Sequence, residues 1–349
     1  MKNLSLINKL LYIINIVLAL LWFCAFLSPY INPQIFSLGA VLAIGYPILL
    51  IIHSFFIVYW LVRFNKVIYL SLSILILSYF FSVPVFQTKS KFKALAKDKS
   101  FSVMSFNAQL FYFDGGLMED IHTLQGKVAH FINQEDASIV CLQESRKSIA
   151  SSLNYPYQSV NAFSQIYSKF EIIYSAKISF LENSSNQSSF ADIVVNYDTV
   201  RVYNLHLESL HLGNDDYSLL TEWDEETKEY QLQDKTKKLR SKINKASYIR
   251  VSQVEQIIES IASSPYPTLI CGDFNDVAQS YIYRRLKTEH RDTFLESGKG
   301  FGATFRKLLF PFRIDFILAH NSWSAYNFEV LDEKLSDHQA IRCDIEIND

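Results

Sequence analysis

The chain has 349 residues, of which 49% are hydrophobic and 19% are charged, and its formal net charge is -2 at pH 7. These averages combine two unlike parts. Up to residue 86 the charged residues are Lys2, Lys9, Arg63 and Lys66, whereas 29 basic and all 35 acidic residues follow, which gives the second part a net charge of -6. That balance argues against strong non-specific binding of nucleic acid, which needs a positive surface that displaces counterions.

Three uncharged apolar runs precede residue 87, at 10–27, 35–62 and 67–86. A helix that spans a bilayer needs about 20 apolar residues because lipid offers no partner for exposed backbone groups, and each run is near that length or longer. The runs also lack the polar stripe that helices of globular domains keep. We therefore expect residues 1–87 to form an anchor of three transmembrane helices, with the lipid bilayer as a partner.

Charged residues between the runs bear on orientation. Lys2 and Lys9 precede the first run, and Arg63 and Lys66 separate the second from the third. The positive-inside rule places both groups in the cytoplasm, and an odd number of spans then puts the rest of the chain outside. A second group opposes this orientation, unless it lies on anionic headgroups. It consists of Lys89, Lys91, Lys93, Lys97 and Lys99. We give the first helix more weight and expect an extracytoplasmic domain.

A basic linker at 88–100 leads to alternating short strands and helices. Residues rich in β-branched and aromatic side chains predict strands at 101–107, 138–143, 193–196, 200–207, 268–271 and 313–318. Residues 195–200 have the composition of a hairpin turn. Apolar residues at helical spacing predict helices around 121–131 and 254–261. This mixture of hairpins and crossovers indicates that residues 101–349 form an α/β sandwich with more than one sheet.

A charged segment at about 212–247 interrupts this pattern. It is acidic at first, at Glu222, Asp224, Glu225 and Glu226. It is basic afterwards, at Lys235, Lys237, Lys238, Arg240, Lys242 and Lys245. The segment predicts a helical insertion, which either is solvated or presents a basic face to a membrane or a substrate.

Polar groups stand at the ends of the predicted strands. In chain order the segments are SFN (105–107), LQE (142–144), NLHL (204–207), GDFND (272–276), RIDFIL (313–318) and SDH (336–338). A buried strand has little reason to carry such groups unless they meet one another or a cation, since an unpaired buried charge is costly. Oxygen ligands imply a hard ion such as magnesium, and the four cysteines lack zinc-type spacing. Carboxylates and two histidines around such an ion suit hydrolysis of a phosphate ester.

In this order the six segments resemble those of the endonuclease/exonuclease/phosphatase family, which includes deoxyribonucleases, sphingomyelinases and inositol polyphosphate phosphatases. The resemblance covers about residues 100–347, and its most specific parts are GDFND, RIDFIL and SDH. It implies the α/β (α+β) class, a four-layer α-β-β-α sandwich with two mixed sheets, and a metal-dependent phosphoric ester hydrolase. Because of its apolar runs, the chain looks like a bacterial-type member of this family that is anchored in the inner (cytoplasmic) membrane.

The resemblance also implies a metal site. Glu144 would be the principal ligand of Mg²⁺, with Mn²⁺ as the alternative ion. Asn107 and Asp337 would complete the site directly or through water. Gln109 stands where some family nucleases carry an acidic residue, which argues against a second metal ion.

Catalytic roles follow from the same resemblance. Asp273 would position the attacking water, and Asn275 would hold the phosphate. His338 would contact the scissile phosphate, oriented by Asp315. His206 would lie across the phosphate and assist departure of the leaving group.

The sequence leaves the substrate open, because no aromatic-and-basic stripe of the kind that binds single strands is evident. Many relatives carry arginine in a Ser-Arg-Phe-Pro segment, and Lys169 occupies what looks like that place, where it would meet a phosphate as a point charge. A phosphodiesterase of nucleic acid is favoured by GDFND. A phosphodiesterase or phosphomonoesterase of a lipid headgroup or small phosphate is favoured by the anchor and the net charge of -6. A catalytically silent membrane protein is opposed by the complete carboxylate and histidine set, and we expect no obligate protein partner.

Overall fold

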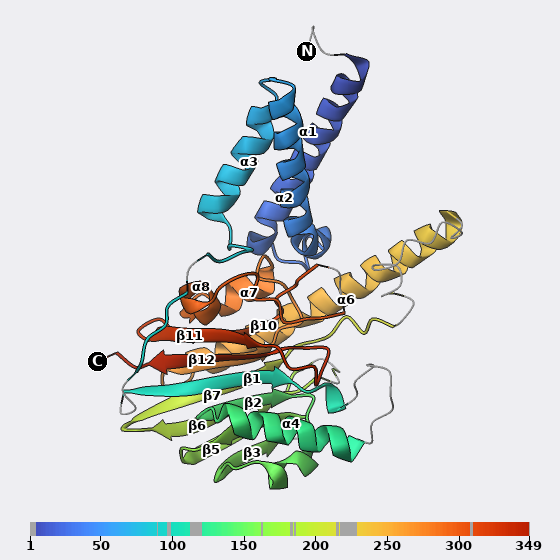
Figure 1. The fold of residues 1–349 in the computed structure, drawn as a ribbon. Coiled ribbons are helices and arrows are strands. Elements are labelled where there is room, and N and C mark those ends of the chain that lie inside the picture. The colour runs from blue at the N-terminus through green and yellow to red at the C-terminus, as the bar shows by residue number, and fades with distance from the viewer. Residues whose placement is uncertain are drawn as a thin grey trace.

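The structure is a computed structural model that describes residues 5–88, 90–95, 99–111, 121–161, 163–181, 184, 186–213, 216, 229–307 and 310–348. N-terminal helices stand on one side of a domain that is built from two sheets and their covering helices (Figure 1). The N-terminal segment, which lacks acidic residues, and the rest of the chain, which contains them, therefore lie apart in space as well as in the sequence.

The N-terminal part contains α1 (Leu6–Leu27), the short 3-10 helix η1 (Ser28–Tyr30), α2 (Leu38–Val62) and α3 (Ile68–Phe81). Among the described residues, α1 and α2 are long and apolar enough to cross a bilayer, whereas α3 has 14 residues. The structure thus has two helices of spanning length instead of the three expected. α3 ends early because Ser82 has extended backbone and Pro84 follows, and proline disfavours helix in the residue before it.

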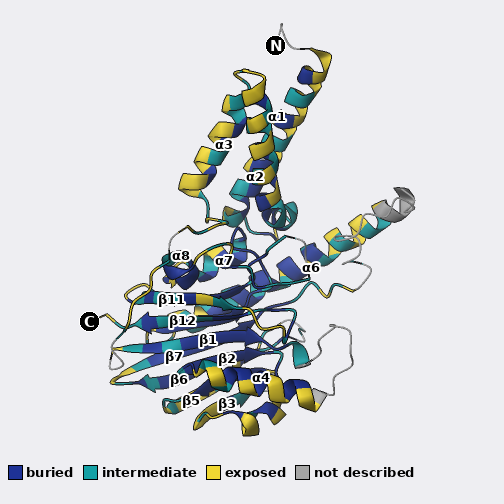
Figure 2. Cartoon of the chain, in the orientation of Figure 1, coloured by how far each residue is buried: buried dark blue, intermediate teal, exposed yellow. Residues whose placement is uncertain are grey.

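The outward faces of these helices are apolar, and many large side chains such as Phe55 are exposed there (Figure 2). Polar side chains instead pair between the helices. Trp22 Nε1 donates to Ser78 Oγ (3.0 Å), and Tyr59 Oη donates to Asn8 Oδ1 (2.7 Å). Apolar outer faces with hydrogen bonds between helices are typical of helices packed in lipid.

Two six-stranded sheets form the rest of the chain, in the orders β11-β12-β1-β2-β4-β3 and β5-β6-β7-β8-β10-β9. The first contains β1 (Ser100–Asn107), β2 (Ile139–Gln143), β3 (Tyr157–Asn161), β4 (Ser164–Ser168), β11 (Ser324–Leu331) and β12 (Ala340–Glu346). The second contains β5 (Ile172–Ile178), β6 (Ser188–Val195), β7 (Asp198–His206), β8 (Thr268–Asp273), β9 (His290–Asp292) and β10 (Asp315–His320). Both sheets are mixed, because β1 pairs with β2 and β7 with β8 in parallel, and the other described pairs are antiparallel.

Helices cover the outer faces of both sheets. The helix α4 (Ile121–Glu135) packs on the first sheet, and α6 (Glu229–Ala262) and α7 (Tyr281–Leu286) pack on the second. Shorter turns connect the strands: η2 (Gln109–Phe111), η3 (Lys147–Ser152) and α8 (Thr293–Ser297). The predicted four-layer α-β-β-α sandwich with two mixed sheets is confirmed.

Alternation along the strands directs the polar residues inward. In β1, Phe101 and Val103 enter the core between the two sheets, whereas Met104 and Phe106 face α4. Because strand side chains alternate between faces, Asn107 lies on the same face as Val103. The same alternation on β2, β7, β8 and β10 places one polar side chain of each strand at the same edge of the inter-sheet core.

The charged insertion predicted at about 212–247 is only partly separate from the domain. Its acidic residues at 222–226 lie outside the described residues, but its basic residues form the first half of α6, which continues unbroken to Ala262. In the second half, Val251, Val254 and Ile257 pack on the second sheet. A helix anchored at one end therefore carries the basic segment past the edge of the sheet (Figure 1).

Gly272 of the GDFND segment has a backbone conformation that other residues rarely adopt, with φ of 138°. A Cβ atom at this position would collide with the backbone of Leu205 on β7. The close approach lets the two parallel strands align so that His206 lies opposite Asp273. The glycine is thus needed for packing that positions the adjacent polar side chains.

Contacts between the N-terminal helices and the sandwich are both apolar and polar. Ala43 of α2 packs with Val277 and Phe312 of the sandwich. Ser28 Oγ donates to the carbonyl of Gln279 (3.3 Å).

The basic linker also lies against the sandwich. Lys91 Nζ is 3.4 Å from Glu296 Oε1, and Lys93 Nζ is 2.9 Å from Glu346 Oε2. Lys89 and Lys97 lie outside the described residues. At least two of the five linker lysines therefore contact carboxylates of the domain itself.

Candidate active site

A buried polar layer caps the inter-sheet core at the strand ends. Gln143 Nε2 of β2 donates to Ser105 Oγ of β1 (3.1 Å) and to Asn204 Oδ1 of β7 (2.6 Å). Asn204 Nδ2 in turn donates to the carbonyls of Leu142 and Gln165 (both 2.9 Å). These hydrogen bonds join the two sheets and give the cluster above them a rigid floor.

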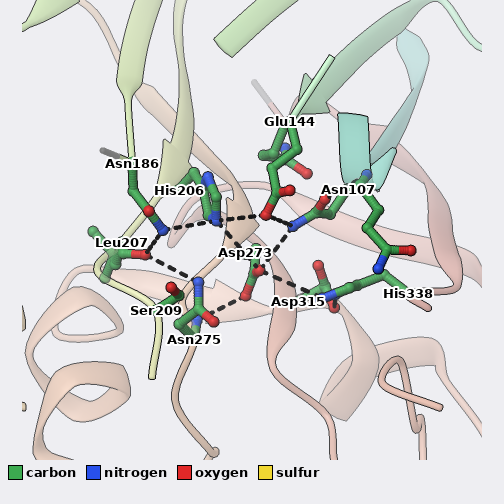
Figure 3. A network of polar contacts seen from close by, with 12 residues as sticks. Asn107, Glu144, Asn186, His206, Leu207, Ser209, Asp273, Asn275, Asp315 and His338 are labelled. Carbon is green, nitrogen blue, oxygen red and sulfur yellow. Dashed lines mark hydrogen bonds and ion pairs between the residues drawn. The ribbon is translucent and has the colours of Figure 1, made fainter. Parts of the chain in front are cut away.

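Asp273 is the centre of that cluster (Figure 3). Asn107 Nδ2 donates to Asp273 Oδ2 (3.1 Å) and lies 3.3 Å from Glu144 Oε1, so one amide bridges carboxylates of the two sheets. Burial, followed by the nearby Asp315 carboxylate, raises the pKa of Asp273 to about 6. Burial also raises the pKa of Glu144. Both carboxylates are therefore held where negative charge is disfavoured unless a cation or a proton joins them.

Two histidines flank Asp273, and the Nε2 atom of each lies 3.8 Å from Asp273 Oδ2. His338 Nδ1 is 2.9 Å from Asp315 Oδ2, which fixes the ring and points Nε2 at the cluster. Burial alone would lower the pKa of His338, but the carboxylates of Asp315 and Asp273 outweigh it and raise the pKa to about 10. His338 is therefore an imidazolium at neutral pH, beside the predicted position of the phosphate.

His206 has the opposite protonation tendency. Its Nε2 atom accepts a hydrogen bond from Asn186 Nδ2 (2.9 Å) and lies 3.4 Å from Glu144 Oε1. Burial lowers the pKa of His206. Two histidines with pKa values pushed in opposite directions can serve different steps of one reaction.

Asn275 is held at the rim of the cluster by its own turn. Its backbone N–H donates to Asp273 Oδ1 (2.7 Å), and its Nδ2 donates to the carbonyl of Leu207 (3.0 Å). The buried side chain of Arg250, from α6, donates to the Asn275 carbonyl and lies 3.5 Å from Asp276 Oδ2. The long helix thus supports the catalytic turn directly.

Strained backbone concentrates around the cluster. The residues Gln109, Glu144, His211 and Asn275 all have positive φ, between 46° and 52°. Such conformations cost free energy outside glycine and persist where the surrounding structure enforces them, which is common at functional sites. At Glu144 and Asn275 the turn occurs one or two residues after a strand and directs the side chain across the strand ends.

Seven of the nine predicted site residues meet in this cluster: Asn107, Glu144, His206, Asp273, Asn275, Asp315 and His338. Asp337 lines the same cleft, but its Oδ2 lies 3.3 Å from Lys307 Nζ. Lys169 is elsewhere, because its Nζ pairs with Asp136 Oδ1 (2.6 Å) at the opposite end of β2 from Glu144. The six residue steps from Ser138 to Glu144 span roughly 20 Å, so the structure does not bring Lys169 to the cluster.

Three residues of the site escaped the sequence reasoning. Asn186 lies in a serine-rich stretch without a motif, so nothing in the sequence distinguishes it. Lys307 lies in a loop and is placed only by tertiary packing. Arg250 does carry a signal, because it stands at helical spacing from the apolar residues Ile243 and Val254 and so belongs to the buried face of α6.

The cluster fits a divalent cation. Among the described residues, the carboxylates of Glu144, Asp273 and Asp337 line the cleft, and Asp315 pairs with His338 beside it. These four carboxylates outnumber the cationic partners His338 and Lys307. Ligand-type atoms of Asp273, Asp315 and His338 lie within 4.8 Å of one another, and the buried Asp315 Oδ1 has no hydrogen-bond donor among the described residues. Excess negative charge and oxygen donors, with no thiolate in the described lining, suit a hard ion.

Comparison with known proteins agrees with this geometry. The model of the Endonuclease/Exonuclease/phosphatase family matches residues 104–338, which is more than half of the chain. The chain therefore belongs to this family of phosphoester hydrolases, whose enzymes depend on a divalent metal ion. A second model, of a domain of unknown function (DUF8431), matches residues 8–84, which hold all of α2 and α3 and all but the first two residues of α1. A search of curated proteins found no match.

Solved structures share the fold at low sequence identity. A conserved protein of unknown function from Enterococcus faecalis is 14% identical, with a TM-score of 0.51, over 71% of this chain and 100% of that one. An endonuclease/exonuclease/phosphatase family protein from Bacteroides thetaiotaomicron is 15% identical, with a TM-score of 0.50, over 71% and 98%. A humanized TDP2 from D. rerio is 16% identical, with a TM-score of 0.50, over 71% and 99%. These similarities establish the sandwich but carry no substrate assignment.

Proposed function

We propose that the chain is a magnesium-dependent phosphodiesterase tethered to a membrane by its N-terminal helices. The observation that supports this best is the meeting of Glu144 and Asn107 from one sheet with Asp273 and His206 from the other, around an excess of negative charge. Glu144 and Asn107 would hold the ion, and Asp337 would reach it directly or through water. When bound, the ion would offset negative charge on the phosphoryl oxygens.

The protein groups then divide the work of hydrolysis. Asp273 takes a proton from the attacking water, whose oxygen bonds to phosphorus while the bond from phosphorus to the leaving ester oxygen breaks. His338, held cationic by Asp315, contacts a phosphoryl oxygen and stabilises its developing charge. Asn275 holds the phosphate from the rim. His206, on the other side of Asp273, assists departure of the leaving oxygen (Figure 3). That oxygen takes a proton from solvent water and ends the reaction as an alcohol, while Asp273 returns its proton to solvent.

Removal of the metal is expected to abolish turnover. After treatment with EDTA, release of p-nitrophenolate from bis(p-nitrophenyl) phosphate should fall to background and return when Mg²⁺ or Mn²⁺ is added. A second measurement does not depend on turnover. Mg²⁺ at a hundred times its Kd should stabilise the fold by about 2.7 kcal/mol. At the same Mg²⁺ concentration the thermal shift should be much smaller in Glu144→Gln, because the variant binds the ion more weakly. Full turnover by protein shown to be metal-free would refute the proposal.

We also propose that the bilayer is a bacterial-type cytoplasmic membrane and that the sandwich lies outside the cytoplasm. The support is the charge before α1 and between α2 and α3. This orientation requires α3 to cross the bilayer as the third span. A C-terminal alkaline phosphatase fusion should be active and a C-terminal green fluorescent protein fusion dark. The reverse result would place the sandwich in the cytoplasm.

A further inference from the structure

The cleft over the catalytic cluster is half apolar. It has a volume of about 350 Å³, and its polar side holds Glu144, Asp273 and His338. Its apolar wall includes Leu239 and Ile243 of α6. Other segments contribute further apolar side chains to the lining, among them Leu210, Leu212, Ile44 and Phe312. A phosphate alone would contact only the polar side. The apolar wall therefore indicates a substrate that also has an apolar part.

Ile44 connects the cleft to the bilayer, because it belongs to α2. It lies six residues beyond the start of that helix at Leu38, or about 9 Å along its axis. A helix of 25 residues exceeds the hydrocarbon thickness of about 30 Å by only a few ångströms at each end. If α2 is centred in the bilayer, Ile44 therefore lies just inside the hydrocarbon boundary, and the cleft opens at the level where lipid chains meet their headgroups.

The first half of α6 has the chemistry of a helix at that level. Leu239, Ile243 and Ala246 form one row at helical spacing. One position earlier in each case, Lys238, Lys242 and Lys245 form the neighbouring row. Basic residues beside an apolar face are typical of helices that lie at an anionic membrane surface. Figure 1 shows this half of α6 extending from the sandwich on the side of the N-terminal helices.

The same cleft suits a nucleic acid poorly. Its described basic side chains are Lys307, which pairs with Asp337, and the histidines His211 and His338. His211 Nε2 lies 3.0 Å from Glu208 Oε1, so it too is beside a carboxylate. A nucleic acid backbone needs a run of positive side chains along its path, and the segment after residue 86 has a net charge of -6.

We propose that the substrate is an amphipathic phosphodiester of the phospholipid type, which enters the cleft from the bilayer. Its phosphate occupies the carboxylate and histidine cluster, and an alkyl chain lies along Leu239, Ile243 and Ile44. This assignment rests on the proposed phosphodiesterase function and on the membrane tether. It explains why a helix of the sandwich and a helix of the anchor line one cleft with the catalytic residues.

The first experiment compares two substrates with the full-length protein in nanodiscs and Mg²⁺. One is a diacyl phospholipid with a chromogenic headgroup, and the other is the same headgroup phosphodiester without acyl chains. We expect kcat/KM to be at least about 100-fold higher for the lipid. Equal values would overturn the lipid assignment and leave the phosphodiesterase function intact. Faster hydrolysis of an oligonucleotide than of the lipid would overturn it as well.

Variants distinguish binding of the lipid by the apolar wall from a higher rate that is due only to enrichment of the lipid substrate at the membrane. Leu239→Asn and the double variant Leu239→Asn with Ile243→Asn should lower the ratio of lipid to chain-free kcat/KM at least tenfold. A matched control replaces Ile173 and Leu181, exposed apolar residues far from the cleft, by asparagine. It keeps the tether and should keep the wild-type ratio. A ratio unchanged in both pairs would refute a role for the wall. Thermal unfolding confirms that each variant is folded.

A labelling experiment tests whether a lipid binds in the cleft and does not require turnover. A long-chain alkyl phosphate with a diazirine at the chain end is irradiated with the metal-loaded protein, and labelled peptides are mapped by mass spectrometry. Label on peptides that contain Ile44 or residues 239–243, displaced by dodecyl phosphate, supports the site. Label confined to the outer faces of α1 to α3 overturns it. If no diester is hydrolysed but the cleft is labelled, the proposed function fails while the lipid site stands.

Discussion

Asp273→Asn is expected to lower kcat for bis(p-nitrophenyl) phosphate by about 10³-fold or more, with little change in the midpoint of thermal unfolding. Asparagine keeps the shape, and its Oδ1 can accept one of the two hydrogen bonds that Asp273 receives from Asn107 and from the Asn275 backbone. Its amide nitrogen can neither accept the other nor take a proton from water. Loss of a positioned general base typically costs 10² to 10⁴ in rate. The measurement is steady-state hydrolysis at saturating Mg²⁺.

Two comparisons make this result specific. Asp198→Asn changes an exposed carboxylate at the other end of β7, away from the cluster, and should leave kcat unchanged. Glu144→Gln should instead raise the Mg²⁺ concentration needed for half-maximal rate, because it removes a charged ligand and leaves the base in place. If Asp273→Asn retained more than a tenth of the wild-type kcat, Asp273 would not be the base.

The second large effect concerns pH, and it acts through Asp315. In the proposed mechanism, the wild type is active with Asp273 deprotonated and His338 protonated. The rate should therefore fall below the pKa of Asp273, near 6 in the metal-free cluster, and again above that of His338, near 10. The negative charge of Asp315 raises both pKa values, since it disfavours a second carboxylate and favours an imidazolium.

Asp315→Asn removes that charge, so both pKa values should fall. The acid limb of the kcat/KM profile moves to lower pH because Asp273 stays deprotonated there. The alkaline limb also moves to lower pH because the buried His338 loses its proton earlier, and activity at pH 9 should drop at least tenfold relative to wild type. A bound cation shifts the absolute positions, so the direction relative to wild type is the test. An alkaline limb that stayed in place would mean that Asp315 does not hold the proton on His338.

Strand geometry explains how much of the site could be predicted from the sequence. Asn107, His206, Asp273 and Asp315 each occupy an alternating position that continues the core face of an apolar strand, so a local pattern sets the face on which they lie. The order of the segments then indicated the family, and with it the pairing of two mixed sheets. Length and the absence of charge likewise identified α1 and α2 as helices able to cross a bilayer.

Other features depended on contacts between residues far apart in the chain. Lys169 follows a strand, as several site residues do. That end of the strand points away from the cluster, and Lys169 pairs there with Asp136. Asp337 belonged to a strong motif, yet its neighbour Lys307 comes from a loop whose path the sequence pattern does not specify. Local patterns determine the face and the element on which a side chain lies, whereas its partners are set by how those elements pack.

The apolar wall of the cleft is the clearest case of this division. The sequence alone predicted a hydrolase of the endonuclease/exonuclease/phosphatase family, preceded by apolar helices. It left open whether the substrate is a nucleic acid or a lipid. Only the tertiary structure brought Ile44 of α2 and Leu239 of α6 to the same cleft as Asp273. No local pattern could decide this, because almost 200 residues separate Ile44 from Leu239 and their meeting depends on how α2 and α6 dock across the end of the sandwich.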